Sequence, residues 1–221
     1  MMKKTFKLLN LLLIAVTLLA GYWYYDQGGL WRKGLASFGF VLVGLVNLVY
    51  CWKAHPQRRK SACWLAVGLV FSMAGDILLN MEFIPGAITF GVGHVCYFLS
   101  YCHLLPLRKR DWIPCGVIFA ISAAIILLVP MLDFGSTLMT AVCLAYALVI
   151  SLMTGKAVSN LLRKRGTVTV LLALGSLLFY FSDLMLVFHA FGNGPHFMDT
   201  LCLATYYPAQ CILGASLFFK E

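Results

Sequence analysis

Apolar residues occur along this chain in eight long runs, which short polar or charged segments separate. The runs cover residues 8–25, 34–52, 62–81, 87–105, 112–130, 134–153, 167–190 and 197–219. Each is close to the ~20 residues that an α-helix needs to cross the hydrocarbon core of a bilayer. The pattern predicts an all-α integral membrane protein with eight transmembrane helices in one transmembrane domain, residues 1–221. We expect the first run to be a retained helix rather than a cleaved signal peptide, because no clear cleavage motif follows it.

Composition supports this prediction. Hydrophobic residues make up 62% of the chain and charged residues only 11%, whereas a soluble domain has about 25% charged residues. Little sequence is left for a soluble domain. The eight cysteines fall almost entirely inside the apolar runs, and none forms a C-x-x-C pair. We interpret them as small buried hydrophobic residues rather than as metal ligands or disulfides.

The lysines and arginines are distributed unevenly between the two sides of the predicted bundle. Of the 17 lysines and arginines, all but Arg32 and Lys33 fall at the N-terminus, in the second, fourth and sixth connections, or in the C-terminal tail. Cationic residues are enriched on the cytoplasmic side of membrane proteins. Both termini are therefore predicted to be cytoplasmic. The net charge of +9 indicates topology rather than a nucleic-acid partner.

The sequence also contains a weak internal repeat. Residues around Asp76 match residues around Asp183 when the chain is shifted by 107 positions. Both predicted helices run from the cytoplasmic to the outer side, as a parallel repeat requires. A parallel four-plus-four duplication is one interpretation, and chance similarity between apolar helices is the other.

Polar side chains recur at helical spacing on four predicted helices. Residues three or four positions apart share one face of a helix. These faces comprise Ser72, Asp76 and Asn80; Phe90, His94, Tyr97 and Tyr101; Ser176, Tyr180 and Asp183; and Cys202, Tyr206 and Gln210. Lipid cannot satisfy such groups, so the faces are predicted to turn to the bundle interior or to a wet cavity.

The two intramembrane aspartates are the strongest candidates for chemistry. A carboxylate at the bilayer centre costs roughly 2.5–3.5 kcal/mol, so such residues suggest a functional site. The helix register places Asp76, His94 and Asp183 in the outer half of the membrane, where they can meet. Lys33 lies at the outer end of the second helix, where it can face the same cavity and suit an anionic head group.

Purely structural roles are the competing interpretation. Either aspartate can hold helices together through hydrogen bonds, and His94 can serve packing. The sequence contains no G-x-S-x-G, H-E-x-x-H, P-loop or G-x-G-x-x-G motif. The candidate for chemistry that remains is the pair of intramembrane aspartates. Burial and a neighbouring carboxylate both disfavour a second negative charge, so one carboxyl can keep its proton as a general acid while the other acts as a base.

The ordered motifs resemble a known family. They are Gly75-Asp76 with Leu79 in the third helix; Phe90, His94 and Tyr97 in the fourth; Gly175, Phe179 and Ser182-Asp183 in the seventh; and Tyr206-Tyr207-x-Ala209-Gln210 in the eighth. Together they resemble the lysoplasmalogenase family, the YhhN-like multi-pass membrane proteins. The chain departs from the family at Lys33-Gly34, where Lys-Pro is common.

This resemblance implies hydrolysis of the vinyl ether bond of lysoplasmalogens to a fatty aldehyde and glycerophosphocholine or glycerophosphoethanolamine. Asp76 and Asp183 would be catalytic. Substrate-binding residues would be Lys33, Asn80, His94, Tyr97, Tyr180, Ser182, Tyr206 and Gln210. The expected partners are a lysophospholipid within the bilayer and other membrane lipids. No metal or other cofactor is expected. We expect the protein in a bacterial inner membrane.

Two other functions compete with this one. Buried acids would suit a small proton-coupled transporter, although corresponding spans show no obvious broken helices. A metal-dependent intramembrane lipid hydrolase would use Asp76, His94 and Asp183 as ligands, which are residue types that zinc accepts.

Overall fold

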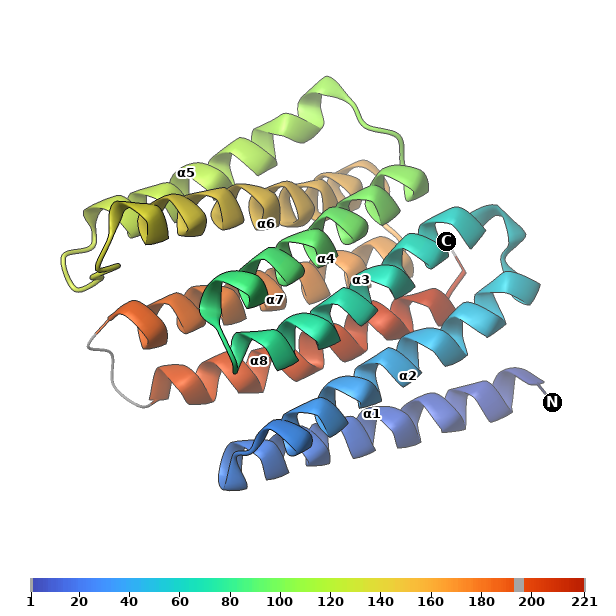
Figure 1. Cartoon of the computed structure of the whole chain (residues 1–221). Helices are drawn as coiled ribbons and strands as arrows, with labels where there is room; N and C mark the ends of the chain where they lie inside the picture. Colours follow the sequence, from blue (N-terminus) through green and yellow to red (C-terminus); the bar gives the residue numbers. More distant parts are fainter. Residues whose placement is uncertain (1, 193–196, 221) are drawn as a thin grey trace.

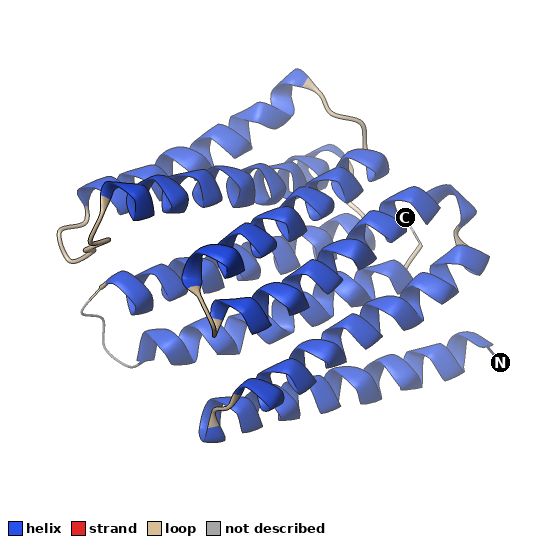
Figure 2. Ribbon diagram, in the orientation of Figure 1, coloured by secondary structure: helices blue, strands red, loops and turns tan. Residues whose placement is uncertain are grey.

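The computed structural model describes residues 2–192 and 197–220. Within these residues the chain forms eight long helices joined by short connections (Figures 1 and 2). They are α1 (Met2–Gln27), α2 (Leu30–Ala54), α3 (Arg59–Leu79), α4 (Phe83–Leu104), α5 (Trp112–Leu128), α6 (Thr137–Arg163), α7 (Thr167–Phe191) and α8 (Phe197–Ala215). All eight are long and apolar enough to cross a membrane. The predicted all-α membrane fold is confirmed.

One predicted boundary was wrong in an informative way. The sixth helix was expected to end at residue 153, with Lys156 in a cytoplasmic connection. Instead α6 continues to Arg163, and Lys156 is completely buried inside it. The Lys156 ammonium lies 2.7 Å from a carboxylate oxygen of Asp111. This partner allows a charged residue to remain within the packed helix.

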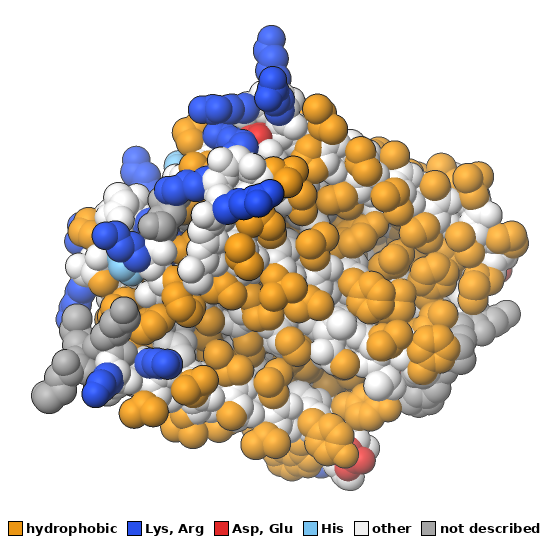
Figure 3. Space-filling view, turned by 180° about the vertical axis from the view of Figure 1, so that it is seen from behind, with side chains coloured by type: hydrophobic (Ala, Val, Ile, Leu, Met, Phe, Trp, Pro, Cys, Tyr) orange, Lys and Arg blue, Asp and Glu red, His pale blue; other side chains and the backbone are white. Residues whose placement is uncertain are grey.

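Both ends of the chain lie at the same end of the bundle (Figure 1). Seen from behind, hydrophobic side chains cover most of the surface, while Lys and Arg side chains gather toward that same end (Figure 3). An even number of crossings brings the termini to one side. The cytoplasmic assignment of that side stays a prediction.

Consecutive helices pair closely, and two of these pairs contribute to the site. In the α3–α4 pair, Gly68 lies against the ring of Tyr97, and Gly75 lies against the ring of Phe90. A Cβ atom added at either glycine would come within 2.6 Å of the facing ring. Small residues allow this close approach of membrane helices. The α3–α4 and α7–α8 pairs thus bring polar faces together in the bundle interior.

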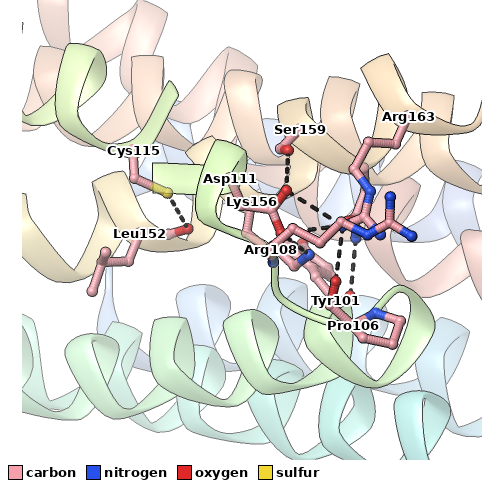
Figure 4. Close-up of polar contacts among 10 residues, drawn as sticks. Tyr101, Pro106, Arg108, Asp111, Cys115, Leu152, Lys156, Ser159 and Arg163 are labelled. Atoms are coloured by element: carbon pink, nitrogen blue, oxygen red, sulfur yellow. Dashed lines mark hydrogen bonds and ion pairs between the residues drawn. The ribbon is translucent and has the colours of Figure 1, made fainter. Parts of the chain in front are cut away.

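A buried charge cluster joins the start of α5 to α6 (Figure 4). The carboxylate of Asp111 accepts hydrogen bonds from Lys156 Nζ at 2.7 Å, Ser159 Oγ at 2.5 Å and Arg163 Nη1 at 3.1 Å. The backbone N–H of Arg108 also donates to it at 2.8 Å. These charged and polar donors offset the desolvation of the carboxylate. Asp111 lies just beyond the C-terminal end of α4, whereas Asp76, on α3, lies near the N-terminal end of α4. The 22 residues of α4 therefore separate the two carboxyl groups by ~30 Å.

Candidate functional site

Asp76 connects three helices. It lies near the end of α3 and is only 3% exposed. One carboxylate oxygen, Oδ2, accepts hydrogen bonds from Ser37 Oγ on α2 at 2.5 Å and from Tyr206 OH on α8 at 2.8 Å. The other, Oδ1, lies 3.8 Å from Lys33 Nζ. Two hydroxyl donors and a cation therefore compensate the burial of this carboxylate.

The tight turn between α1 and α2 positions Lys33. Gly28 and Gly29 adopt φ values of 61° and 91°, a region that glycine occupies without steric cost. The turn brings Tyr24 of α1 beside Lys33 in the first turns of α2, with the ammonium 5.6 Å from the ring centroid. Lys33 thus lies between an aromatic face and the carboxylate of Asp76, and little of it is exposed.

Asp183 on α7 accepts a hydrogen bond in a second polar cluster, whose other members lie on α4 and α6. Tyr146 OH donates to Asp183 Oδ2 at 2.6 Å. His94 Nε2 lies 2.7 Å from Tyr146 OH and 3.4 Å from Asp183 Oδ2. Because the Tyr146 proton goes to Asp183, its hydrogen bond with His94 requires an N–H at Nε2. His94 is fully buried, so Tyr146 can link an inaccessible imidazole to the carboxyl group.

Both aspartates line a single polar cavity of about 290 Å³. Four further predicted site residues line it: Lys33, Asn80, Ser182 and Tyr206. The rest of the lining consists of Tyr24, Leu79, Phe90, Leu186, His189, Asp199, Cys202 and Leu203. A concave space with a few converging polar groups is the usual form of a small-molecule site. The aspartates, far apart in sequence, therefore belong to one candidate site.

Asp183 also lines a second cavity, which is almost entirely apolar and lies among α4, α5, α6 and α7. Leu79, Phe90 and Leu186 line both cavities. Tyr180 belongs to the apolar one, where its hydroxyl lies 2.9 Å from Ser122 Oγ. Asp183 therefore stands where a polar space meets an apolar one.

Three predicted site residues line neither cavity: His94, which contacts Tyr146 and Asp183, and Tyr97 and Gln210, which contact each other. Tyr97 OH donates to Gln210 Oε1 at 2.8 Å and lies 3.1 Å from Ser72 Oγ. Neither Tyr97 nor Gln210 is among the residues that line the two cavities. Asn80 lines the polar cavity, and its side-chain N–H donates to the backbone oxygen of Asp76 at 2.8 Å. Gln210 Nε2 is buried with no hydrogen-bond partner among the described residues.

Sequence reasoning missed two residues that contact the carboxylates directly. Ser37 lies one helical turn after Lys33, so the register of the second helix could have revealed it. Tyr146 gave no comparable signal, because it is a single tyrosine within a long apolar run. His189 and Asp199 also line the polar cavity. The sequence suggested no special role for His189 because it lies near the end of a predicted span, and it did not single out Asp199.

The alternative metal site is not assembled. In the part of the chain that the structure describes, no group of three or more His, Cys, Asp and Glu side chains is placed to hold a metal ion. His94 and Asp183 are close together, but Asp76 belongs to a different hydrogen-bonded group.

Comparison with known families decides the classification. A sequence model of the YhhN family matches residues 37–217, most of the chain, including both aspartates. The chain belongs to the YhhN family. Lys33 and Tyr24 precede the matched region, although they line the same cavity as the matched residues. No solved structure matches the chain. The protein is thus a multi-pass membrane protein of the YhhN family.

Proposed function

We propose that this YhhN-family protein hydrolyses the vinyl ether bond of a lysoplasmalogen. The products are a fatty aldehyde and glycerophosphocholine or glycerophosphoethanolamine. The observation that carries the proposal is the position of Asp183, where the polar and apolar cavities meet. In the lipid, the vinyl ether bond likewise lies between a polar head and an apolar chain. The alternative functions lack an equally specific feature.

The polar cavity suits the head of such a lipid. Lys33 supplies the ammonium that would face the phosphate, and the Tyr24 ring beside it shields this cation. Asn80 and Ser182 offer hydrogen-bonding groups for the glycerol. The chain would extend from Asp183 into the apolar cavity. This orientation puts the reacting carbon atoms beside Asp183 and leaves Asp76 on the polar side.

The different surroundings of the two aspartates suggest different roles. Two hydroxyl donors and an ammonium face Asp76, which favours a carboxylate that acts as the base. Asp183 accepts a hydrogen bond from the Tyr146 hydroxyl, lies 3.4 Å from His94 Nε2 and borders the apolar cavity. Its place beside the chain, to which the β-carbon of the vinyl ether belongs, favours Asp183 as the proton donor. Pairs of carboxyl groups in contrasting environments divide acid and base roles in this way.

The proposed reaction consumes one water molecule. Asp183 donates its proton to the β-carbon of the enol ether, and the electron pair of the double bond forms the new C–H bond. The resulting oxocarbenium ion is stabilised by the Asp76 carboxylate. Asp76 then takes a proton from water, whose oxygen attacks the α-carbon. The hemiacetal collapses to the aldehyde as its C–O bond to glycerol breaks. The proton on Asp76 moves to the glycerol oxygen, and the hemiacetal hydroxyl proton restores Asp183.

The test is aldehyde release from a lysoplasmalogen by detergent-purified protein, with and without a chelator. We expect release that survives the chelator and falls by at least ~10²-fold in Asp183→Asn, the range that general acid catalysis contributes. Release that a chelator abolishes and a metal restores would instead support the metal-dependent hydrolase. Folded protein that releases no aldehyde would contradict the proposal, and proton-coupled uptake into proteoliposomes would then be measured.

A further inference from the structure

An apolar groove runs along the outside of the bundle between α4 and α6. It has a volume of about 380 Å³, and its lining includes Gly91 and Val95 of α4 and Ala145 and Val149 of α6. Ile88, Val92 and Val95 on this side are exposed, as expected for a surface in contact with lipid chains. No charged residue is among the described residues that line the groove.

The groove adjoins the candidate site. Ala87, Val142 and Tyr146 line both the groove and the apolar cavity beside Asp183. These three side chains are therefore the wall between the lipid-facing surface and the interior. The Tyr146 ring belongs to this wall, while its hydroxyl donates to Asp183 at 2.6 Å. One side chain thus connects the membrane side of the wall to the carboxyl group.

We propose that the alkyl chain of a single-chain lipid occupies this groove and passes between α4 and α6 to reach Asp183. The inference rests on the proposed function, because it assigns the route by which that substrate arrives. A chain already dissolved in the bilayer meets the groove without crossing water. Rotation of the Tyr146 ring opens the wall and removes its hydroxyl from Asp183, so access of the chain and release of the carboxyl group are linked.

A second groove, between α1 and α8, fits this role less well. It is lined by Gly21, Tyr22, Tyr25, Thr200 and Ala204 among others, and it shares only Leu203 with the polar cavity. It therefore leads toward the head-group side of the site. An alkyl chain entering there would have to pass the polar residues before reaching the apolar cavity.

Gly91 allows the groove to be filled without disturbing the fold. A Cβ atom added at Gly91 meets no atom within 4 Å, and the same holds for Gly116 on α5. Gly116 does not line the groove. Replacing glycine in a helix interior is favourable for the helix by up to ~1 kcal/mol. Gly91→Trp is therefore the test variant, and Gly116→Trp is its matched control.

The experiment measures binding rather than cleavage. Both variants and the wild type are reconstituted in phosphatidylcholine vesicles with a saturated-ether lysophosphatidylcholine that carries a diazirine at its chain end. After photolysis, labelled residues are located by mass spectrometry. We expect labelling on α4, α5 and α6. In Gly91→Trp the labelling should fall about tenfold, the effect of losing contacts to about two methylene groups. Gly116→Trp should label like the wild type.

Labelling that is confined to α1 and α8, or that Gly91→Trp leaves unchanged, would overturn the proposal. Gly91→Leu is a second variant for the case in which Gly91→Trp unfolds, and thermal unfolding reports on both. Because the probe has no vinyl ether, its labelling of the protein does not depend on whether the protein hydrolyses that bond. The expected labelling without aldehyde release by the wild type would support the chain route and contradict only the proposed hydrolysis.

Discussion

At the scale of single residues, the two aspartates make the sharpest prediction. Asp76→Asn and Asp183→Asn keep the size of the side chain and a hydrogen-bond acceptor, but neither can exchange a proton. We expect each to lower aldehyde release by at least ~10²-fold while the protein stays folded. The measurement is the initial rate of purified protein, with thermal unfolding as the control. Wild-type rates in both variants would rule out the acid–base pair.

Tyr146 carries the second prediction. Tyr146→Phe keeps the ring but removes the hydroxyl between His94 and Asp183. Leaving buried polar groups without this partner costs about 1–3 kcal/mol. We expect a rate about tenfold lower and a changed pH profile, because the link from His94 to the acid is broken.

Tyr180→Phe is the matched control for this prediction. It removes a hydroxyl that bonds to Ser122 at 2.9 Å and lines the apolar cavity. No hydrogen bond joins it to either aspartate among the described contacts. Its rate should stay within about twofold of the wild type, the range of a near-neutral substitution. Equal losses in both variants, with unchanged pH profiles, would indicate general loosening of the cavity instead.

The sequence revealed the charged members of the site better than the polar ones. Asp76, Asp183 and Lys33 stand out because charge in a membrane span is costly. Tyr206 follows from its helical face. Ser37 and Tyr146 do not stand out, since serine and tyrosine are common in membrane helices and their partners lie on other helices. Tertiary packing alone decides which hydroxyl reaches which carboxylate.

At the scale of helices, length and apolar composition determine that a span exists, while tertiary contacts determine where it ends. The buried Lys156 shows the difference. Sequence reasoning treats a lysine at the end of an apolar run as a connection residue, but Asp111 and Ser159 make its continuation in α6 stable. No local pattern indicates this pairing, because Asp111 belongs to the connection between α4 and α5.

The same cluster yields a stability prediction. Lys156→Met removes the fully buried cation from Asp111 and leaves the carboxylate with fewer donors. Breaking a buried ion pair typically costs about 3–5 kcal/mol, and replacing both partners costs much less. We expect Lys156→Met to lower the free energy of unfolding by about 3 kcal/mol, and Lys156→Met with Asp111→Asn to recover most of it.

Unfolding in mixed detergent micelles, followed by tryptophan fluorescence, provides the measurement. Lys109→Met is the control, because Lys109 is exposed in the same connection; its effect should stay within about 0.5 kcal/mol. If Lys156→Met alone were as stable as the wild type, the cluster would add nothing to the docking of α5 on α6.

At the scale of the whole molecule, the sequence predicted that four polar faces turn inward but not which faces meet. Tyr97 and Gln210 pair with each other, while Asp76 and Asp183 share a cavity with Lys33. The contact between α4 and α6, which shapes the apolar groove, joins helices that are not consecutive. The periodicity of one helix cannot specify such neighbours, because every apolar face is compatible with lipid or with another helix. The four-plus-four repeat stays a prediction.

The orientation of the bundle is the last prediction. Lys33, Asn80 and Asp199 line the polar cavity near the start of α2, the end of α3 and the start of α8. They therefore lie toward the end of the bundle opposite both termini (Figure 1). The bias of lysines and arginines predicts that the termini are cytoplasmic, so the site should take its lipid from the leaflet that faces away from the cytoplasm.

Reporter fusions in a bacterial host can decide this orientation. We expect a fluorescent protein at the C-terminus to fluoresce and alkaline phosphatase at the same position to be inactive, because phosphatase folds only outside the cytoplasm. Alkaline phosphatase fused after Gln27, at the end of α1, should be active. The opposite pattern would place the polar cavity in the cytoplasmic half. The water-soluble product would then be released into the cell, and substrate added only to the outside of intact cells would be cleaved slowly.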